Sequence, residues 1–129
     1  MAGHTVIPVK VPHGFNGWSY AFRFESNMGS WAYMSDCIDL EDLAPWRGLD
    51  LLVLGTSFYQ EPAPLEGRSV YDVREELELV AALKPRRTVF THLGHGADIR
   101  TPLPDGIIFA QDGLTLGLPW SLCPFDIRA

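Results

Sequence analysis

The sequence predicts an α/β domain built on a mixed sheet with one main helix. Residues 49–55 form a short continuous apolar run, which is typical of a strand buried on both faces. Residues 69–83 carry apolar side chains at helical spacing, and 87–91 form a second strand-like run. A strand, a helix and a strand in this order normally cross over right-handed and make parallel neighbours. The 129 residues fit a single domain, 1–129, with a core of its own.

The N-terminal segment predicts two strands separated by a turn. Residues 5–11 alternate branched and polar side chains as a strand does, and Pro12 ends this run. His13 therefore lies on a turn, which the following glycines make conformationally permissive. Residues 18–25 predict a second strand, with aromatic side chains on both faces.

A third strand is predicted immediately after the second. Residues 26–29 form a hairpin signal, and 30–34 continue as a strand that runs into Asp36. Residues 39–46 are short and acidic, and we expect at most one helical turn there before the apolar run at 49–55.

The main helix is expected to begin at Ser69, which can cap it with Asp72 three residues on. Val73, Leu77 and Val80 share one face of this helix, and it ends near residue 83 before Lys84-Pro85. The following strand, 87–91, ends at His92. Further on, 107–110 and 114–118 predict a hairpin that turns at Asp112-Gly113.

Composition and charge exclude several classes of function. The net charge is -6 and no run of Lys or Arg occurs, which disfavours a nucleic-acid partner and an anionic membrane surface. The chain is 47% hydrophobic, with four Trp and seven Phe, as a folded globular protein is. That aromatic load leaves room for an apolar surface covered by another subunit or another chain, as in a homo-oligomer.

The two cysteines, Cys37 and Cys123, can pair but need not. We find no signal peptide and no apolar stretch of spanning length, so a reduced, cytoplasmic setting is expected and both thiols are expected to be free.

Three residues at predicted strand ends are candidate metal ligands: His13, Asp36 and His92. Two imidazoles and a carboxylate are the ligand types that hold zinc or a similar ion with open positions for water. Loops at the ends of adjacent strands lie close together, so residues far apart in sequence can meet there. The alternatives stay open, since a strand-end His is often an ordinary surface residue and an Asp after Ser is often a turn residue.

His95, three residues after His92, is a candidate catalytic residue. It can orient a ligand, act as an acid or base, or merely occupy the loop between Gly94 and Gly96. Cys37 follows Asp36 directly, but its segment is apolar and holds no His nearby, so we expect a buried thiol rather than a nucleophile.

In this order, the segments resemble the C-terminal half of the metallo-β-lactamase superfamily, specifically its branch of phosphodiesterase-like hydrolases related to phosphoribosyl cyclic phosphodiesterase and ribonuclease Z. The resemblance covers nearly the whole chain, and the ordered series is far more specific than any one piece. The matching stretches are Val11-Pro12-His13-Gly14, Trp31-Ala32-Tyr33-Met34-Ser35-Asp36-Cys37, Gly48-Leu49-Asp50-Leu51-Leu52-Val53-Leu54, the helix near 75–83, Thr91-His92-Leu93-Gly94-His95, Leu103-Pro104-Asp105-Gly106 and Asp112-Gly113-Leu114.

The resemblance implies a fold, a chemistry and a role for each ligand. The fold is an αββα sandwich of two facing sheets flanked by helices, of which this chain would form half. His13 would bind one metal ion, Asp36 would bridge two, and His92 would bind the other. Zinc is the usual ion in the family and manganese is a further option. The implied reaction is hydrolysis of a small phosphodiester or related ester substrate by metal-bound hydroxide.

The sequence departs from the family pattern in two places. The defining cluster His-x-His-x-Asp-His belongs to the N-terminal half and does not occur here, so we expect the site to be incomplete without such a half. The loop before the helix, 66–71, lacks the His found in the phosphodiesterase branch. Arg68 or Tyr71 can substitute as a phosphate contact; otherwise Arg68 faces solvent and Tyr71 packs. The alternative function is a non-catalytic half-domain that self-associates or pairs with a partner chain.

Overall fold

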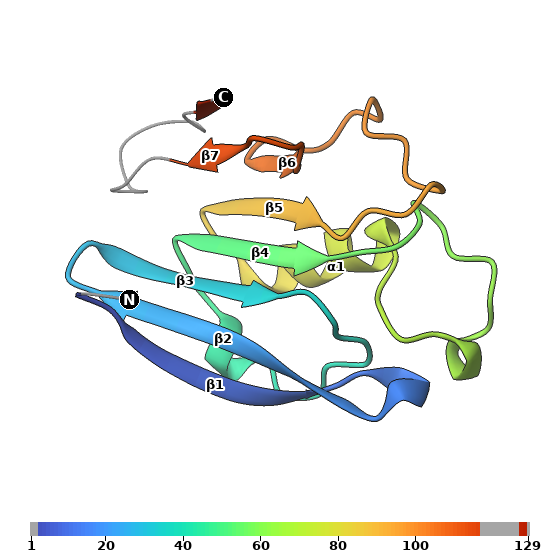
Figure 1. The fold of residues 1–129 in the computed structure, drawn as a ribbon, viewed down its shortest axis with the longest axis horizontal. Coiled ribbons are helices and arrows are strands. Elements are labelled where there is room, and N and C mark those ends of the chain that lie inside the picture. The colour runs from blue at the N-terminus through green and yellow to red at the C-terminus, as the bar shows by residue number, and fades with distance from the viewer. Residues whose placement is uncertain (1–2, 117–126, 129) are drawn as a thin grey trace.

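The computed structural model describes residues 3–116 and the backbone of 127–128. Its strands build a six-stranded mixed sheet and a separate two-stranded one, with one α-helix among the described residues (Figure 1). The strands are β1 (Thr5–Pro12), β2 (Trp18–Ser26), β3 (Gly29–Met34), β4 (Leu51–Gly55), β5 (Arg87–Thr91), β6 (Ile107–Phe109), β7 (Thr115–Leu116) and β8 (Ile127–Arg128). The helices are α1 (Val73–Leu83) and three 3-10 turns at Gly14–Asn16, Ala44–Trp46 and Leu65–Gly67.

The six strands lie in sequence order, from β1 to β6. The first two neighbouring pairs are antiparallel and the next three are parallel. The expected crossover is confirmed, since β4 and β5 are parallel neighbours joined through α1. Consequently β1, β3, β4, β5 and β6 all run in the same direction and end at one edge of the sheet (Figure 1).

The main core lies between the sheet and the elements that cover one of its faces. Val73 and Leu83 of α1 and Trp46 of the second 3-10 turn pack there against side chains from the strands. The fully buried strand members of this core are Val11, Ala21, Ala32, Met34, Leu52, Leu54 and Phe90. The apolar run of β4 is buried here because α1 covers one of its faces.

The opposite face of the sheet is aromatic, and this differs from the sequence expectation. Aromatic side chains were expected on both faces of β2, but they occupy alternate positions and therefore lie on one face. Register continues this face across β3, where Phe22 lies beside Tyr33 and Phe24 beside Trp31. The rings of Phe24 and Trp31 stack with centroids 4.0 Å apart. A second, smaller cluster around Leu51 covers part of this face.

The helix starts three residues later than expected. Asp72, and not Ser69, is the N-cap, and it forms a capping box with Glu75. The Asp72 carboxylate accepts from the Glu75 amide at 2.9 Å, and the Glu75 carboxylate accepts from the Asp72 amide at 2.9 Å. The helix ends as expected, with Lys84 in a left-handed conformation at the C-cap.

The expected hairpin between 107–110 and 114–118 does not form. β6 adds to the main sheet as a parallel neighbour of β5, while β7 pairs with β8. The reason is burial: Ile107 and Phe109 pack into the main core, which the crossover loop from β5 lets them reach. The end of the expected second strand and Cys123 lie outside the described residues. Within the described part of the chain, no helix is both long and apolar enough to cross a membrane.

Candidate metal centre

The three candidate ligands lie at one edge of the sheet. His13 follows β1, Asp36 comes two residues after β3, and His92 follows β5. Because these three strands run in the same direction, their carboxyl ends meet the same edge (Figure 1). The structure therefore places the three residues on one side of the molecule although 79 positions separate the first from the last. Their role as metal ligands stays a prediction.

The order of the strands spaces the candidates across this edge. β2 separates β1 from β3, and β4 separates β3 from β5. Neighbouring strands lie about 4.8 Å apart, so two strand spacings separate the end of β3 from the end of β1 and from the end of β5. Accordingly, no three His, Cys, Asp or Glu side chains among the described residues gather closely enough to hold a metal ion.

His13 is held by the segment before α1. Its Nδ1 lies 2.7 Å from the carbonyl oxygen of Ser69. Because a carbonyl can only accept, the proton of the neutral ring is on Nδ1 and the lone pair is on Nε2. A backbone carbonyl that fixes the tautomer in this way is the usual second partner of a metal-binding histidine.

The turn after His13 approaches the same segment closely. Gly14 has φ +57°, and a Cβ at this position would clash with the carbonyl group of Arg68. That carbonyl also accepts from the amide of Phe15 at 3.4 Å. Glycine is therefore required at position 14 both for its backbone angle and for the contact.

Arg68 does not face solvent, contrary to the simpler of the two expectations for it. Its side chain is 8% exposed and forms ion pairs with Glu75 and Asp72. Tyr71 packs as expected, and its hydroxyl accepts from the Leu40 amide at 2.6 Å. Burial raises the pKa of Tyr71 to about 12, so its hydroxyl stays protonated.

Asp36 is half-buried where β3 ends. Its Oδ2 accepts from the Ser35 hydroxyl at 2.8 Å. The end of β4 packs directly beneath this turn, since a Cβ on Gly55 would clash with the backbone of Ser35. The next residue, Cys37, is buried as expected, and burial together with the nearby Glu76 carboxylate raises the pKa of its thiol to about 12. A thiol of this kind is a core side chain and not a nucleophile.

His92 is exposed and adopts a strained backbone. Its φ is +57°, a left-handed angle that costs a residue with a Cβ about 1–3 kcal/mol when held in this way. It lines a cavity of about 290 Å³ together with Gln111 and Asp112. His95 is exposed farther along the same loop, and the structure leaves its catalytic role a prediction. Strain at a strand end is typical of residues whose side chain has a function.

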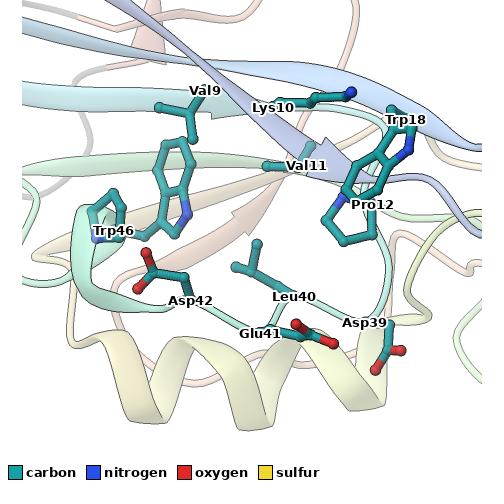
Figure 2. A pocket seen from close by; sticks show the side chains of 11 residues that line it. Val9, Lys10, Val11, Pro12, Trp18, Asp39, Leu40, Glu41, Asp42 and Trp46 are labelled. Atoms are coloured by element: carbon teal, nitrogen blue, oxygen red, sulfur yellow. The ribbon is translucent and has the colours of Figure 1, made fainter.

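A separate pocket of about 350 Å³ opens at the outer edge of the sheet, beside β1 (Figure 2). Figure 2 shows Trp18 and Trp46 at its two sides and three carboxylates from residues 39–42 along its lower wall. None of the three candidate ligands lines this pocket, although Pro12 beside His13 does. The pocket is therefore separate from the three candidate ligands.

The donor set fits a divalent ion of the zinc type. Two imidazoles and a carboxylate suit zinc, and manganese also accepts carboxylate and imidazole ligands. The Ser69 carbonyl leaves Nε2 of His13 as the ring nitrogen with a free lone pair. Three donors spread over four strand intervals, from β1 to β5, need further ligands to complete one or two coordination spheres.

Comparison with models of protein families and with curated proteins finds no match. Solved structures do match. A diphosphatase of the PhnP family is 31% identical over 96% of this chain and 46% of its own, with a TM-score of 0.76. The short form of human tRNase Z is 13% identical over 87% of this chain and 42% of its own, with a TM-score of 0.64. Zn²⁺-bound PqqB from Methylobacterium extorquens is 18% identical over 92% of this chain and 52% of its own, with a TM-score of 0.71.

All three structures have the metallo-β-lactamase fold, which confirms the resemblance seen in the sequence. The mixed sheet with one main helix agrees with half of that fold. The chain spans about half the length of the structures it matches. This chain is therefore similar to metallo-β-lactamase fold proteins, and its sheet and helix correspond to about half of that fold.

Proposed function

We propose that the chain supplies part of a dinuclear metal site in a hydrolase of phosphodiester or related ester bonds, and that the N-terminal half of the fold completes this site. In this proposal His13 would hold one ion, His92 would hold the other and Asp36 would contribute to both. The observation that carries it is the order along the sheet edge, with a carboxylate between two imidazoles. A carboxylate has two oxygens and can bridge two cations, whereas each imidazole binds one.

The proposal also draws on the tautomer of His13 and on the solved structures. The Nδ1 hydrogen bond to Ser69 prepares Nε2 as a ligand before any ion arrives. One match is named a diphosphatase and another a tRNase, which supports a phosphate-containing substrate. Zinc is the proposed ion, because PqqB binds it in the same fold, and manganese is the second choice.

A pair of divalent ions supplies positive charge that stabilises the oxygens of a displacement at phosphorus and makes a water molecule more acidic. The residues of this chain hold that charge in place. His13 is oriented by a backbone carbonyl, and Asp36 is oriented by the Ser35 hydroxyl. His95, in the loop after His92, is proposed to transfer a proton to or from the substrate.

Metal content is the first test. The purified chain is dialysed against Zn²⁺ or Mn²⁺ and analysed for bound metal, beside His13→Ala, Asp36→Ala and His92→Ala. Each of the three variants should bind less metal than the wild type, and the control His4→Ala should bind the same amount. Equal metal content in all five proteins would refute the ligand assignment.

Catalysis is the second test. Because the chain lacks the His-x-His-x-Asp-His cluster, we expect it alone to hydrolyse bis(p-nitrophenyl) phosphate very slowly. Adding a polypeptide that carries the cluster-bearing half of the fold should increase the rate, and Asp36→Ala should abolish the increase. Chelator-sensitive hydrolysis by the chain alone, lost in Asp36→Ala, would contradict the claim that the site is incomplete.

A non-catalytic half-domain that pairs with a second copy of itself is the other candidate function. The aromatic face of the sheet favours it, because Trp18 is 61% exposed, Tyr20 58% and Tyr33 40% on the same side. A folded monomer rarely leaves several large aromatic side chains together in water. Sedimentation of the chain should then show a dimer, and a monomer that binds no hydrophobic dye would exclude this function.

A further inference from the structure

The segment from Arg68 to Asp72 contacts three of the loops that form the site edge. Its first two carbonyls bind the turn after β1, through the Phe15 amide and the His13 ring. The amide of Tyr71 donates to the carbonyl of Cys37, next to Asp36, at 3.2 Å. The carbonyl of Tyr71 accepts from the Thr56 hydroxyl at 3.0 Å, in the loop after β4. The segment therefore connects the surroundings of His13 and Asp36.

Arg68 fastens this segment to the first turn of α1. Its Nη1 donates to Oε2 of Glu75 at 3.2 Å, and its Nη2 donates to Oε1 of the same carboxylate. Nη2 also lies 3.9 Å from the Asp72 carboxylate and donates to the Val70 carbonyl at 3.4 Å. Two parallel hydrogen bonds between a buried guanidinium and one carboxylate hold a fixed geometry, unlike a single ion pair between two exposed side chains.

The same two carboxylates also cap the helix, so the segment and the helix end share one network. Asp72 is the N-cap residue and Glu75 completes the capping box. A planar guanidinium can reach both carboxylates and a carbonyl at once, which the single ammonium of Lys cannot do. Removing the guanidinium would leave the Glu75 carboxylate without its partner and free the segment to move relative to α1.

We propose that Arg68 is a positioning residue for His13: through Glu75 and Asp72 it fixes the Ser69 carbonyl, which holds the imidazole with its proton on Nδ1 and its lone pair on Nε2. The inference rests on the proposed function, because the orientation of His13 matters only if His13 binds metal. The tautomer itself is a property of the metal-free chain. It adds a residue that contacts neither ion nor substrate. It also gives Arg68 a role that does not include binding phosphate.

The test is the tautomer of His13 in the folded, metal-free chain. Nitrogen-15 spectra of the imidazole distinguish the Nδ1-H from the Nε2-H form, and His13→Ala assigns the signal. Wild type should show mainly the Nδ1-H form. Arg68→Met should shift the signal toward the Nε2-H form, and Arg68→Lys should restore part of the wild-type spectrum. The matched control is Arg23→Met, which removes an arginine that pairs with Glu25 and the Pro45 carbonyl away from His13.

A second readout is the affinity for Zn²⁺, which Arg68→Met should lower by about 10- to 100-fold, as is typical when a partner of a ligand is lost. If Arg68→Met does not fold, Glu75→Gln replaces it, because Gln retains the capping box but loses the charge that pairs with Arg68. An unchanged Nδ1-H signal in a folded variant overturns the proposal. If the tautomer shifts but wild type binds no Zn²⁺, Arg68 still positions His13 and it is the proposed metal function that fails.

Discussion

Replacing Glu76 by Gln should raise the free energy of unfolding at neutral pH and weaken its dependence on pH. Glu76 lies on α1 with 1% of its side chain exposed, and its Oε2 has no hydrogen-bond partner within the described part of the chain. Burial, together with the carboxylates of Asp72 and Glu75, raises the pKa of Glu76 well above its ordinary 4.5. The folded protein therefore keeps this carboxyl protonated where the unfolded chain does not.

The size of the effect follows from proton linkage. Below about pH 4.5 both states hold the proton, and the pH has no effect through this group. Above that pH the unfolded chain releases the proton while the folded chain retains it, so stability falls by about 1.4 kcal/mol per pH unit until the folded pKa is reached. Between pH 5 and 7 the loss is at most about 3 kcal/mol, and Gln, which does not titrate, avoids it.

Urea unfolding followed by tryptophan fluorescence at pH 5, 6 and 7 measures this difference, at one protein concentration because the chain can associate. The stability gap between Glu76→Gln and wild type should widen as the pH rises. Glu78→Gln is the matched control, since Glu78 is exposed on the same helix. A gap that stays constant with pH, or one that Glu78→Gln reproduces, would refute the reasoning.

Three further predictions concern the turn, the core and the thiol. Gly14→Ala should cost about 1–3 kcal/mol in thermal unfolding and shift the His13 imidazole signal, because the new Cβ meets the Arg68 carbonyl at a left-handed φ; an unchanged spectrum would contradict this. Phe90→Ala should cost about 3–5 kcal/mol in urea, since Phe90 is fully buried in the main core, and a cost below 1 kcal/mol would count against that packing. In a Cys123→Ser background, Cys37 should react with a thiol reagent only after unfolding, because it is 2% exposed; rapid labelling of the native chain would exclude its burial.

The sequence predicts the placement of the three candidate ligands well because each one follows a strong local signal. Pro12 ends β1 one residue before His13, and the apolar run of β5 ends directly before His92. The shared edge depends on four strand pairings: β1 and β3 are both antiparallel to β2, β3 is parallel to β4, and β4 is parallel to β5 across the intervening helix. Local residues thus fix where each strand ends, and the strand directions bring those ends to one edge.

The predicted start of the helix was wrong because two residues of this segment can act as its N-cap. Ser69 and Asp72 are both good N-caps, and helical spacing alone does not choose between them. The choice depends on the residue three positions later: Glu75 completes a capping box with Asp72, and Asp72 itself is the cap rather than the third helical residue. The Asp-x-x-Glu pattern was present in the sequence and could have placed the cap.

The burial of Arg68 and the partner of His13 could not be predicted from the sequence. An arginine becomes buried only when carboxylates from another turn surround it, and here they lie four and seven positions away on a helix whose start was misplaced. The Ser69 carbonyl is a backbone atom, so no side-chain pattern marks it as a partner of His13. Likewise, β6 joins the main sheet and does not pair with β7 because its side chains pack against the core, a long-range contact that local sequence does not show.

The two proposed functions are linked by the geometry of β1, β2 and β3. The exposed rings of Trp18, Tyr20 and Tyr33 lie on strands of the same sheet whose ends carry His13 and Asp36. A half-domain that covers this face would therefore lie beside the site edge and could bring its own ligands to it. Metal binding must then raise the association constant of the two halves by the same factor by which their association raises the affinity for metal. Sedimentation of the mixed halves with and without Zn²⁺ measures that factor. An association constant that Zn²⁺ leaves unchanged would show that binding at the aromatic face and binding of metal are independent.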